Sequence, residues 1–368
     1  MKIKDVRTRV LRVPVKSPIT DAYFSHKARN HVFVEVETDE GISGLGEAGQ
    51  YFAVSSVPPL IREGFRLYLI GQDPAKVREL WDTLYKRSFL YGRRGVAIIA
   101  LSAVEIALWD IIGKSLKEPL HRLLGGRRVD RVRAYASGGF YKTERDLIRE
   151  MKTFVKSGFT AVKMKVGFDP EDDVRRVKVI RKEIGGDIDL IIDANMGYLP
   201  GTAIKVAREL ENQEILWFEE PVSADDVEGL REVKKNSGIP IAAGENEYTE
   251  FGFRELIEKR AVDIVQADVT RCGGVSQAKQ IASLASRRGM QHAPHVFGSI
   301  VGLVASLHLV ASEANGYILE YDQTEDPLRE EIIDQYVDLR SGYLAIPEKP
   351  GIGVEVPSRL LTKYADKS

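Results

Sequence analysis

From about Val132 onward, short apolar stretches alternate with longer amphipathic ones, and this rhythm constrains the fold most strongly. Eight stretches have the length and apolar character of buried strands: Val132–Ala136, Ala161–Val166, Leu190–Asp193, Ile215–Glu219, Ile239–Gly244, Ile264–Asp268, Gln291–His295 and Tyr317–Glu320. Helix patterns lie between them, such as Glu171–Ile184, Thr202–Glu211 and Ser276–Arg288. Strands alternating with helices predict a parallel sheet with crossover helices. Eight such units in about 200 residues favour a closed barrel over an open sheet.

The beginning of the chain has a different order of elements. Residues 3–15 alternate as a strand does, and residues 31–47 predict a hairpin with its turn at Asp39-Glu40-Gly41. A polar and aromatic loop is expected at Ser17–Asn30. Strands that precede helices, rather than alternate with them, are typical of an α+β unit.

Two helices are expected after the hairpin. One should follow Asp73-Pro74, with Pro74 at its first position, and run to about Arg87. The other, from about Gly95 to Lys114, is apolar on most sides and should be buried. The sequence therefore predicts an α+β capping domain at residues 1–125 and a barrel at residues 126–337. The turn-rich residues 338–368 are expected to pack back against the first domain.

One glycine-rich stretch resembles a nucleotide-binding motif without its context. Gly44-Leu45-Gly46-Glu47-Ala48-Gly49 satisfies the dinucleotide-binding pattern, which requires a strand before it and a helix opening within it. Here the stretch closes a hairpin, and Pro58-Pro59 follows soon after. We therefore expect these glycines to allow close approach of another backbone instead.

Composition narrows the class of partner and the compartment. The chain has 368 residues, 53 Lys and Arg against 54 Asp and Glu, and a formal net charge of -1, which gives no support for nucleic-acid binding. Its single cysteine, Cys272, excludes an intramolecular disulfide and fits a reducing cytoplasm. We expect no signal peptide and no apolar run long enough to cross a membrane.

Ionisable residues recur at or just after the carboxyl ends of seven consecutive predicted strands. They recur roughly every 25 residues, the length of one strand, one helix and their loops: Lys165, Asp193, Glu219, Glu245, Asp268, His295 and Glu320. One charged residue at a strand end is usually a solvated cap. Seven in register are not explained in that way, because a barrel gathers these ends at one mouth, where active sites are built.

Three of these residues predict a metal site. Asp193, Glu219 and Glu245 come from adjacent strands and are all carboxylates, with no Cys or His among them. Each one alone is most often a surface carboxylate. Buried together they would repel one another unless a cation lay among them, and hard oxygen ligands suit Mg²⁺.

Lys163 and Lys165 lie two residues apart on a predicted strand and should therefore point to one face. Taken alone, they fit a half-exposed strand with a charged outer face. Beside the carboxylates, Lys165 is the predicted base, because a neighbouring ammonium lowers the pKa of a lysine. Lys163, one layer deeper, is expected to tune that pKa and to contact a substrate carboxylate.

The opposite flank carries Asp268 and His295. An aspartate bonded to one imidazole nitrogen fixes the tautomer and raises the basicity of the other, so His295 is a second predicted acid or base. His292 is the competing candidate, and a lone histidine is more often structural. Glu320, if protonated, would donate to the substrate carboxylate. No nucleophile motif, P-loop or H-E-x-x-H is present.

Together these motifs resemble the mandelate racemase group of the enolase superfamily. The matching segments are Lys163-Met-Lys165, Asp193-Ala-Asn195, Glu219-Glu220-Pro221, Gly244-Glu245-Asn246, the pair Asp268 and His295, and Glu320. The resemblance covers essentially the whole chain. It implies a (β/α)₇β TIM-type barrel under an N-terminal α+β capping domain, and Mg²⁺ bound by the three carboxylates. It also implies a homo-oligomer and loops that close over the substrate near Ser17–Asn30 and Gln50-Tyr51.

The reaction within that group stays open at this point. Racemisation, dehydration and lactone isomerisation all use a base next to a carboxylate and a metal that stabilises the enediolate. The polar residues of the covering loop favour a hydroxylated substrate, and several segments are similar to acid-sugar members. We therefore predict a sugar-acid dehydratase, with a cycloisomerase or racemase as the alternative and a non-catalytic acid-binding barrel as a remote one. Predicted substrate contacts are Asn195, Lys163, Glu320, Tyr23 and His26.

Overall fold

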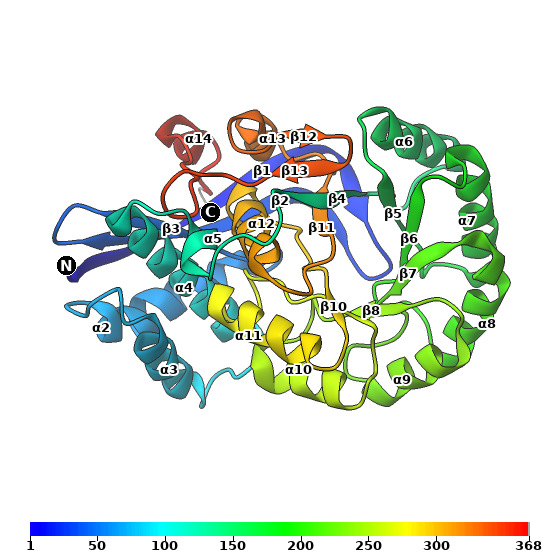
Figure 1. Cartoon of the computed structure of the whole chain (residues 1–368). Helices are drawn as coiled ribbons and strands as arrows, with labels where there is room; N and C mark the ends of the chain where they lie inside the picture. The colour runs from blue at the N-terminus through cyan, green and yellow to red at the C-terminus, as the bar shows by residue number, and fades with distance from the viewer. Residues whose placement is uncertain (367–368) are drawn as a thin grey trace.

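The computed structural model describes residues 1–366 and has two parts, a barrel and a capping domain beside it (Figure 1). Eight strands form the barrel: β4 (Arg131–Ser137), β5 (Ala161–Lys165), β6 (Asp189–Asp193), β7 (Ile215–Glu219), β8 (Ile241–Ala243), β9 (Ile264–Val265), β10 (Gln291–His292) and β11 (Leu319–Asp322). Each pairs in parallel with the next from β4 to β10, and β11 pairs in parallel with β4. A bridge between His292 and Gly316 closes the ring.

Seven helices connect these strands and cover the outside of the barrel (Figure 1): α6 (Glu144–Lys156), α7 (Pro170–Ile184), α8 (Pro200–Leu210), α9 (Val227–Asn236), α10 (Thr249–Glu258), α11 (Val275–Ser286) and α12 (Ile300–Ser312). The predicted (β/α)₇β barrel is confirmed. Its interior is filled by a layer of buried side chains, one from each strand or from a residue next to the strand: Tyr135, Ala161, Ile191, Trp217, Ala242, Ile264, Ala293 and Ile318. This layer plugs the barrel, so the site lies above it.

The strands are shorter than the sequence suggests in the second half of the barrel. β9 ends at Val265 and β10 at His292, so Asp268 and His295 lie in the loops beyond them. Glu320, in contrast, is the second residue of β11 rather than its end. The strand pairing of β9 and β10 thus ends before Asp268 and His295, whereas Glu320 lies within a paired strand.

The capping domain is a three-stranded antiparallel sheet packed against helices. Its strands are β1 (Ile3–Thr20), β2 (Ser25–Thr38) and β3 (Ser43–Ala48). The expected loop at Ser17–Asn30 is wrong, because β1 and β2 continue as a long ribbon in which Ile19 pairs with His26. This ribbon extends from the capping domain over the barrel (Figure 1). Only Asp21–Phe24 turn at its tip.

The helices of the capping domain differ from prediction at their starts. A run of short helical segments over residues 54–69 was not foreseen: η1 (Val54–Ser56), α1 (Val57–Pro59), η2 (Leu60–Phe65) and α2 (Arg66–Leu69). Helix α3 (Val77–Ser88) begins three residues after Pro74, so Pro74 is not its first position. Helix α4 (Val96–Leu116) matches its prediction.

Helix α4 also corrects the statement that no apolar run could cross a membrane. By length and composition α4 could do so. In the structure it is a core helix, since most of its residues are buried and it packs on β3 and β2. Its polar Glu105 and Asp110 are buried as well and bind backbone groups of other segments. A helix that is apolar on all sides has the same composition in a protein core as in a bilayer.

The glycine-rich hairpin end packs on α4, as expected for glycines that allow another backbone to approach closely. A Cβ on Gly44 would lie 2.0 Å from the Ala107 carbonyl oxygen, and one on Gly46 would lie 1.9 Å from that of Ala103. These glycines therefore let strand and helix backbones touch, and they form no nucleotide site.

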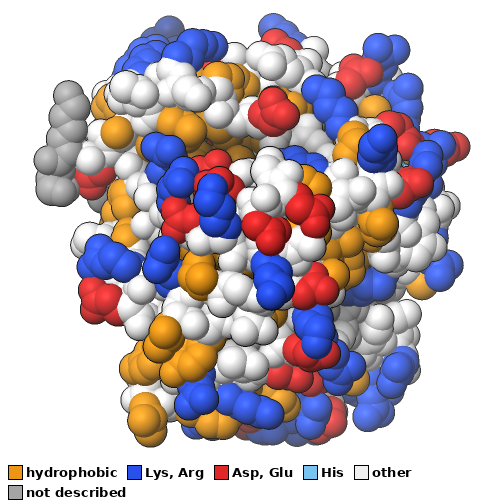
Figure 2. All heavy atoms as spheres, turned by 90° about the vertical axis from the view of Figure 1, so that its left-hand side faces the viewer, with side chains coloured by type: hydrophobic (Ala, Val, Ile, Leu, Met, Phe, Trp, Pro, Cys, Tyr) orange, Lys and Arg blue, Asp and Glu red, His pale blue; other side chains and the backbone are white. Residues whose placement is uncertain are grey.

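The end of the chain contacts both parts. β12 (Leu339–Arg340) and β13 (Tyr343–Ala345) form a hairpin whose second strand pairs antiparallel with β4. After α14 (Ser358–Lys363), the backbone of Asp366 donates to Val10 in β1. On the capping-domain side of the surface, Lys and Arg side chains are interspersed with Asp and Glu (Figure 2). That face offers no extended field of one sign, in keeping with the balanced charge.

Candidate active site

A cavity of about 330 Å³ lies at the carboxyl ends of the barrel strands, beneath the tip of the β1–β2 ribbon. The barrel contributes Lys165, Glu245 and His295 to its wall, and the capping domain contributes Tyr23 and His26. The fold thus brings residues from both domains to one space, and the predicted ionisable groups gather around its floor.

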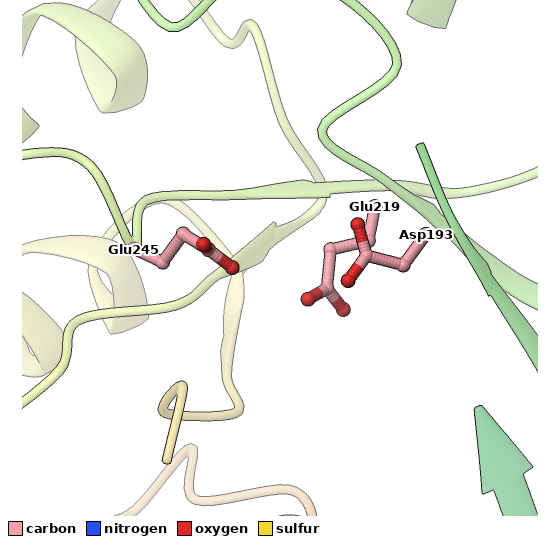
Figure 3. Close-up of side chains that lie close together, drawn as sticks. All are labelled: Asp193, Glu219 and Glu245. Carbon is pink, nitrogen blue, oxygen red and sulfur yellow. The ribbon is translucent and has the colours of Figure 1, made fainter. Parts of the chain in front are cut away.

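The three predicted metal ligands converge, and Figure 3 shows the side chains of Asp193 at the end of β6, Glu219 at the end of β7 and Glu245 in the turn after β8. One oxygen each from Asp193, Glu219 and Glu245 lies within 4.8 Å of the others. Burial raises the pKa of Glu219 to about 7, and the charge of Asp193 adds to this against the pull of Lys163. The Glu245 Oε2 atom is buried and has no hydrogen-bond partner. An oxygen-only, converging donor set in which one buried oxygen has no partner fits a hard divalent cation.

The two lysines point into the barrel at different depths. Lys165 lines the cavity, and its Nζ lies 2.5 Å from Asp193. Lys163 is fully buried below it, with its Nζ 2.5 Å from Glu219 and 2.9 Å from Glu320. Because these partners occupy its ammonium, Lys163 does not reach the cavity, and the predicted contact with a substrate carboxylate does not fit.

The predicted lowering of the Lys165 pKa is also wrong when only the protein's own groups act on it. Burial and Lys163 both lower the pKa of Lys165, but the Asp193 carboxylate outweighs them and raises it above its ordinary value. A cation shared by Asp193 would compete for the same negative charge and so weaken this effect. The Asp193 carboxylate lies 3.4 Å from the Lys163 ammonium and 2.5 Å from that of Lys165, and its attraction exceeds the repulsion between the two lysines.

On the opposite flank, His295 and Asp268 form the predicted pair. His295 Nδ1 lies 2.8 Å from Asp268 Oδ2, and the other oxygen of Asp268 accepts from the backbone and hydroxyl of Thr270 at 2.7 and 2.6 Å. Burial lowers the pKa of His295, but the charges of Glu245, Glu320 and Asp268 raise it to about 9. His295 Nε2 lies 3.6 Å from Glu245 Oε2, so the free nitrogen faces the carboxylate cluster.

His292 is not part of the site. It is fully buried, and its Nδ1 lies 2.7 Å from Glu313 Oε2 at the end of α12.

Glu320 does face the cavity floor, yet its predicted role as a protonated donor does not fit. Burial raises the pKa of Glu320, whereas Lys163 and His295 outweigh it and hold the carboxyl below its ordinary pKa. Glu320 accepts from the Val296 backbone at 2.8 Å and thereby fixes the segment after His295.

The predicted contacts from the loops lie on the cavity wall. Asn195 has a left-handed backbone (φ 39°) and an Oδ1 that is buried without a partner. The exposed Tyr23 donates to the Met196 carbonyl at 3.2 Å, across the mouth. His26 is buried and stacks on Phe52 with ring centroids 4.3 Å apart, and burial lowers its pKa.

The covering segment is less polar toward the cavity than its composition suggests. Phe24 at the ribbon tip and Phe52 after β3 line the cavity, and Phe140 and Phe297 from the barrel loops line it as well. Arg29, counted among the polar residues of the loop, instead lies buried beneath Phe297, with its guanidinium 3.7 Å from the ring centroid. Strand pairing turns alternate residues of the ribbon inward and outward, which a loop prediction ignores.

Several cavity residues were not predicted. Arg271 donates to Asn246 Oδ1 at 3.2 Å and lies over the Tyr51 ring at 5.2 Å. Asn246 Nδ2 in turn donates to Glu220, which is buried behind the cavity wall with both oxygens 3.0 Å away, and burial raises the pKa of Glu220 well above the ordinary value. Arg271 and Asn246 could have been found by counting onward from the last strand residue, because a loop continues the cavity wall after the strand stops.

This arrangement defines a class of protein. Two groups able to exchange protons, Lys165 and His295, flank a cavity whose floor holds a carboxylate cluster fit for a divalent cation. Such a barrel can remove and return a proton next to a carboxylate.

Comparisons with known proteins agree with that class. Residues 4–125 match the model of the mandelate racemase / muconate lactonizing enzyme N-terminal domain, and residues 146–360 match that of the enolase C-terminal domain-like family. The chain belongs to the mandelate racemase and muconate lactonizing enzyme group of the enolase superfamily. It is therefore an enzyme of the lyase or isomerase classes.

Individual relatives span the full chain. It is 36% identical to D-galactarolactone cycloisomerase of Agrobacterium fabrum, over 99% of both chains. It is 35% identical to arabinonate dehydratase of Saccharolobus solfataricus, over 100% of both chains. The crystal structure of a racemase from Streptomyces coelicolor A3(2) with bound magnesium superimposes with a TM-score of 0.90 at 29% identity, covering 99% of this chain and 100% of that one.

Proposed function

We propose that this enzyme is a Mg²⁺-dependent sugar-acid dehydratase, which removes the proton next to a carboxylate and eliminates water from the neighbouring carbon. The observation that carries the proposal is the placement of Lys165 and His295 on opposite flanks of one cavity above the carboxylate cluster. A base on one side and an acid on the other are what an elimination requires.

In this proposal Asp193, Glu219 and Glu245 hold the cation. Bound there, it supplies positive charge that stabilises a carboxylate as electron density moves onto its oxygens. Lys165, the lysine exposed to the cavity, removes the α-proton. His295 is oriented by Asp268 through Nδ1, keeps a proton at neutral pH and donates it from Nε2 to the leaving hydroxyl.

The substrate class follows from the wall and from the relatives. Asn195 Oδ1 has no hydrogen-bond partner among the described residues, and His26 and Arg271 line the same cavity. These groups suit a small hydroxylated acid. The names of the relatives, D-galactarolactone cycloisomerase and arabinonate dehydratase, point to sugar acids. A reducing cytoplasmic compartment and a homo-oligomer remain part of the proposal.

A cycloisomerase is the second candidate, and the aromatic wall favours it. His26, Phe24, Phe52 and Phe297 present ring faces and edges to the cavity. A lactone or anhydro ring has a flat C–H face that packs on such rings better than an extended polyol does. Lys165 and His295 would serve this reaction too, since both reactions begin with the α-proton.

The test is incubation of the full-length enzyme and Mg²⁺ with a panel of aldonic acids, aldaric acids and their lactones in D₂O. A 2-keto-3-deoxy acid product is the expected result. Ring opening or closure without loss of water would establish the cycloisomerase, and inversion with deuterium uptake would establish a racemase. Absence of both product and exchange with every acid would refute proton abstraction by this site.

A further inference from the structure

Two buried glutamates of the capping domain have partners in the barrel that the proposed chemistry does not use. Glu47, near the end of β3, is 1% exposed, and Glu105, in the middle of α4, is 2% exposed. Each lies at the N-terminus of a barrel helix, α12 for Glu47 and α11 for Glu105. Backbone amides in the first turn of a helix have no partner within the helix, and a carboxylate is a favourable acceptor for them.

Glu105 supplies the cap that α11 lacks. The residue before this helix is Gly274, which has no side chain to accept a hydrogen bond. Glu105 Oε2 accepts from the Val275 amide at 2.7 Å, and Oε1 accepts from the Ser276 amide at 3.0 Å. Gly274 has φ +97°, and a Cβ there would lie 2.1 Å from Glu105 Oε2. Any other residue at position 274 would clash with the Glu105 carboxylate, so the glycine is what allows this contact.

Glu47 makes the corresponding contact with α12. Its Oε1 accepts from the Ser299 amide at 2.8 Å, while Oε2 accepts from the Ser299 hydroxyl at 2.7 Å and the Gly302 amide at 2.9 Å. A Cβ on Gly298 would lie 3.0 Å from Glu47 Oε1. Both oxygens of both glutamates are thus occupied by donors from the barrel, so neither carboxylate is free for another ligand.

The two capped helices start directly after the loops that carry Asp268 and His295. The capping domain touches those loops as well: the Gly49 amide donates to the Thr270 carbonyl at 3.0 Å, and Arg29 donates to the Phe297 carbonyl at 2.9 Å. Thr270 in turn holds the carboxylate of Asp268. The loops that carry Asp268 and His295, here called the histidine flank, are therefore held by hydrogen bonds from the capping domain, both within the loops and at the helices that follow them.

The loop after Lys165, here called the lysine flank, is held by barrel residues instead. The loop after Lys165 is held by Asp173 of α7, whose Oδ2 accepts from the amides of Gly167 and Phe168 at 2.9 Å each and from the Tyr198 hydroxyl at 2.6 Å. All of these residues belong to the barrel. Asp173 is 1% exposed, so it matches Glu47 and Glu105 in burial, and like them it accepts two or more hydrogen bonds that include backbone amides of a neighbouring segment.

We propose that Glu47 and Glu105 are positioning residues for the Asp268–His295 pair, and that the capping domain thereby builds one of the two proton-transfer flanks. The capping domain is then part of the catalytic scaffold and more than a cover for the substrate. The inference rests on the proposed function only in assigning proton transfer to His295; the positioning itself is a property of the folded protein.

The test compares Glu47→Gln and Glu105→Gln with Asp173→Asn in the full-length protein. Each amide replaces an accepting oxygen with an NH₂ donor at a similar volume. In ¹⁵N-histidine-labelled protein, the Nδ1–H proton shared with Asp268 is assigned by its absence from His295→Asn. We expect this signal to be lost or shifted upfield in both glutamate variants and retained in Asp173→Asn. Glu47→Asp and Glu105→Asp, which keep the charge, should restore it in part.

A second readout uses the opposite orientation of the two flanks. With an acid from the panel that exchanges in D₂O, the glutamate variants should slow proton exchange on the histidine face by on the order of 10- to 100-fold. Exchange on the lysine face should stay within about twofold. Unchanged Nδ1–H signals in both glutamate variants, or equal loss on both faces, would overturn the positioning role. Because the signal needs no turnover, failure of the panel would count against the proposed function alone.

Discussion

The two flanks of the cavity carry equivalent chemical groups but are supported by different parts of the chain. Lys165 lies at the end of β5, and its loop is held by Asp173 from the helix that follows. His295 lies beyond β10, in a loop whose following helix is capped by Glu47 of the other domain. The lysine flank is local in sequence, whereas the histidine flank depends on contacts across some 250 positions.

This difference shows how a barrel can keep one acid–base group constant and adapt another. A flank built within one strand–helix unit is complete when the barrel folds. A flank closed by a second domain is complete only after that domain has docked on the barrel. The cavity wall agrees with this view, since Tyr23 and His26 come from the same domain that holds the histidine loops.

The largest expected effect comes from removing one proton-transfer group at a time. Lys165→Ala and His295→Asn should each lower kcat/KM by roughly 10²- to 10⁴-fold, because general acid–base groups contribute on this scale. Exchange in D₂O should persist on the face opposite to the lost group. The far-UV circular dichroism spectrum serves as the control for folding and should be the same in both variants as in the wild type.

Two results would contradict the view that Lys165 and His295 act separately, each on its own side of the substrate. Full activity in both variants would show that neither group transfers the proton. Loss of exchange on both faces in either variant would show that the flanks do not act separately.

Much of this site was predictable, and the limits have physical causes. The period of strand and helix placed Asp193, Glu219 and Glu245 at one mouth, because parallel strands end on one side of a barrel. The ribbon was mistaken for a loop, since Ser17–Asn30 contains polar residues on both faces and gains its pairing from tertiary contacts. The caps were missed because Glu105 lies within an apolar helix, where sequence shows only an isolated charge.

A smaller effect is expected from pH, through His31 next to the histidine flank. Its Nδ1 lies 3.3 Å from Glu47 and its Nε2 lies 3.0 Å from Asp326. Burial lowers the pKa of His31, but the two carboxylates outweigh it and raise the pKa to about 9. A histidine whose pKa is raised by folding stabilises the protein fully below the unfolded pKa of about 6.5 and loses this contribution as pH rises through the folded value.

The free energy of unfolding should therefore fall between about pH 6.5 and 9, by about 3 kcal/mol if the whole shift is expressed. Urea unfolding of wild type and His31→Gln across this range isolates the contribution, because His31→Gln should lose the part of the slope that belongs to this residue. Parallel slopes in the two proteins would contradict the assignment. Because His31 contacts Glu47, which holds the segment after His295, loss of the His31 charge should also weaken the Nδ1–H signal of His295 over the same pH range.

The smallest effect is expected where the capping domain reaches the lysine flank. There the exposed Tyr23 donates one hydrogen bond of 3.2 Å to the carbonyl of Met196, beyond the end of β6. An exposed neutral hydrogen bond contributes about 1 kcal/mol or less. Tyr23→Phe should therefore raise KM by no more than about fivefold and leave the free energy of unfolding unchanged within about 0.5 kcal/mol. A loss of activity in Tyr23→Phe as large as that in Glu47→Gln would mean that the capping domain supports both flanks equally. The different numbers of hydrogen bonds to the two flanks would then have no functional consequence.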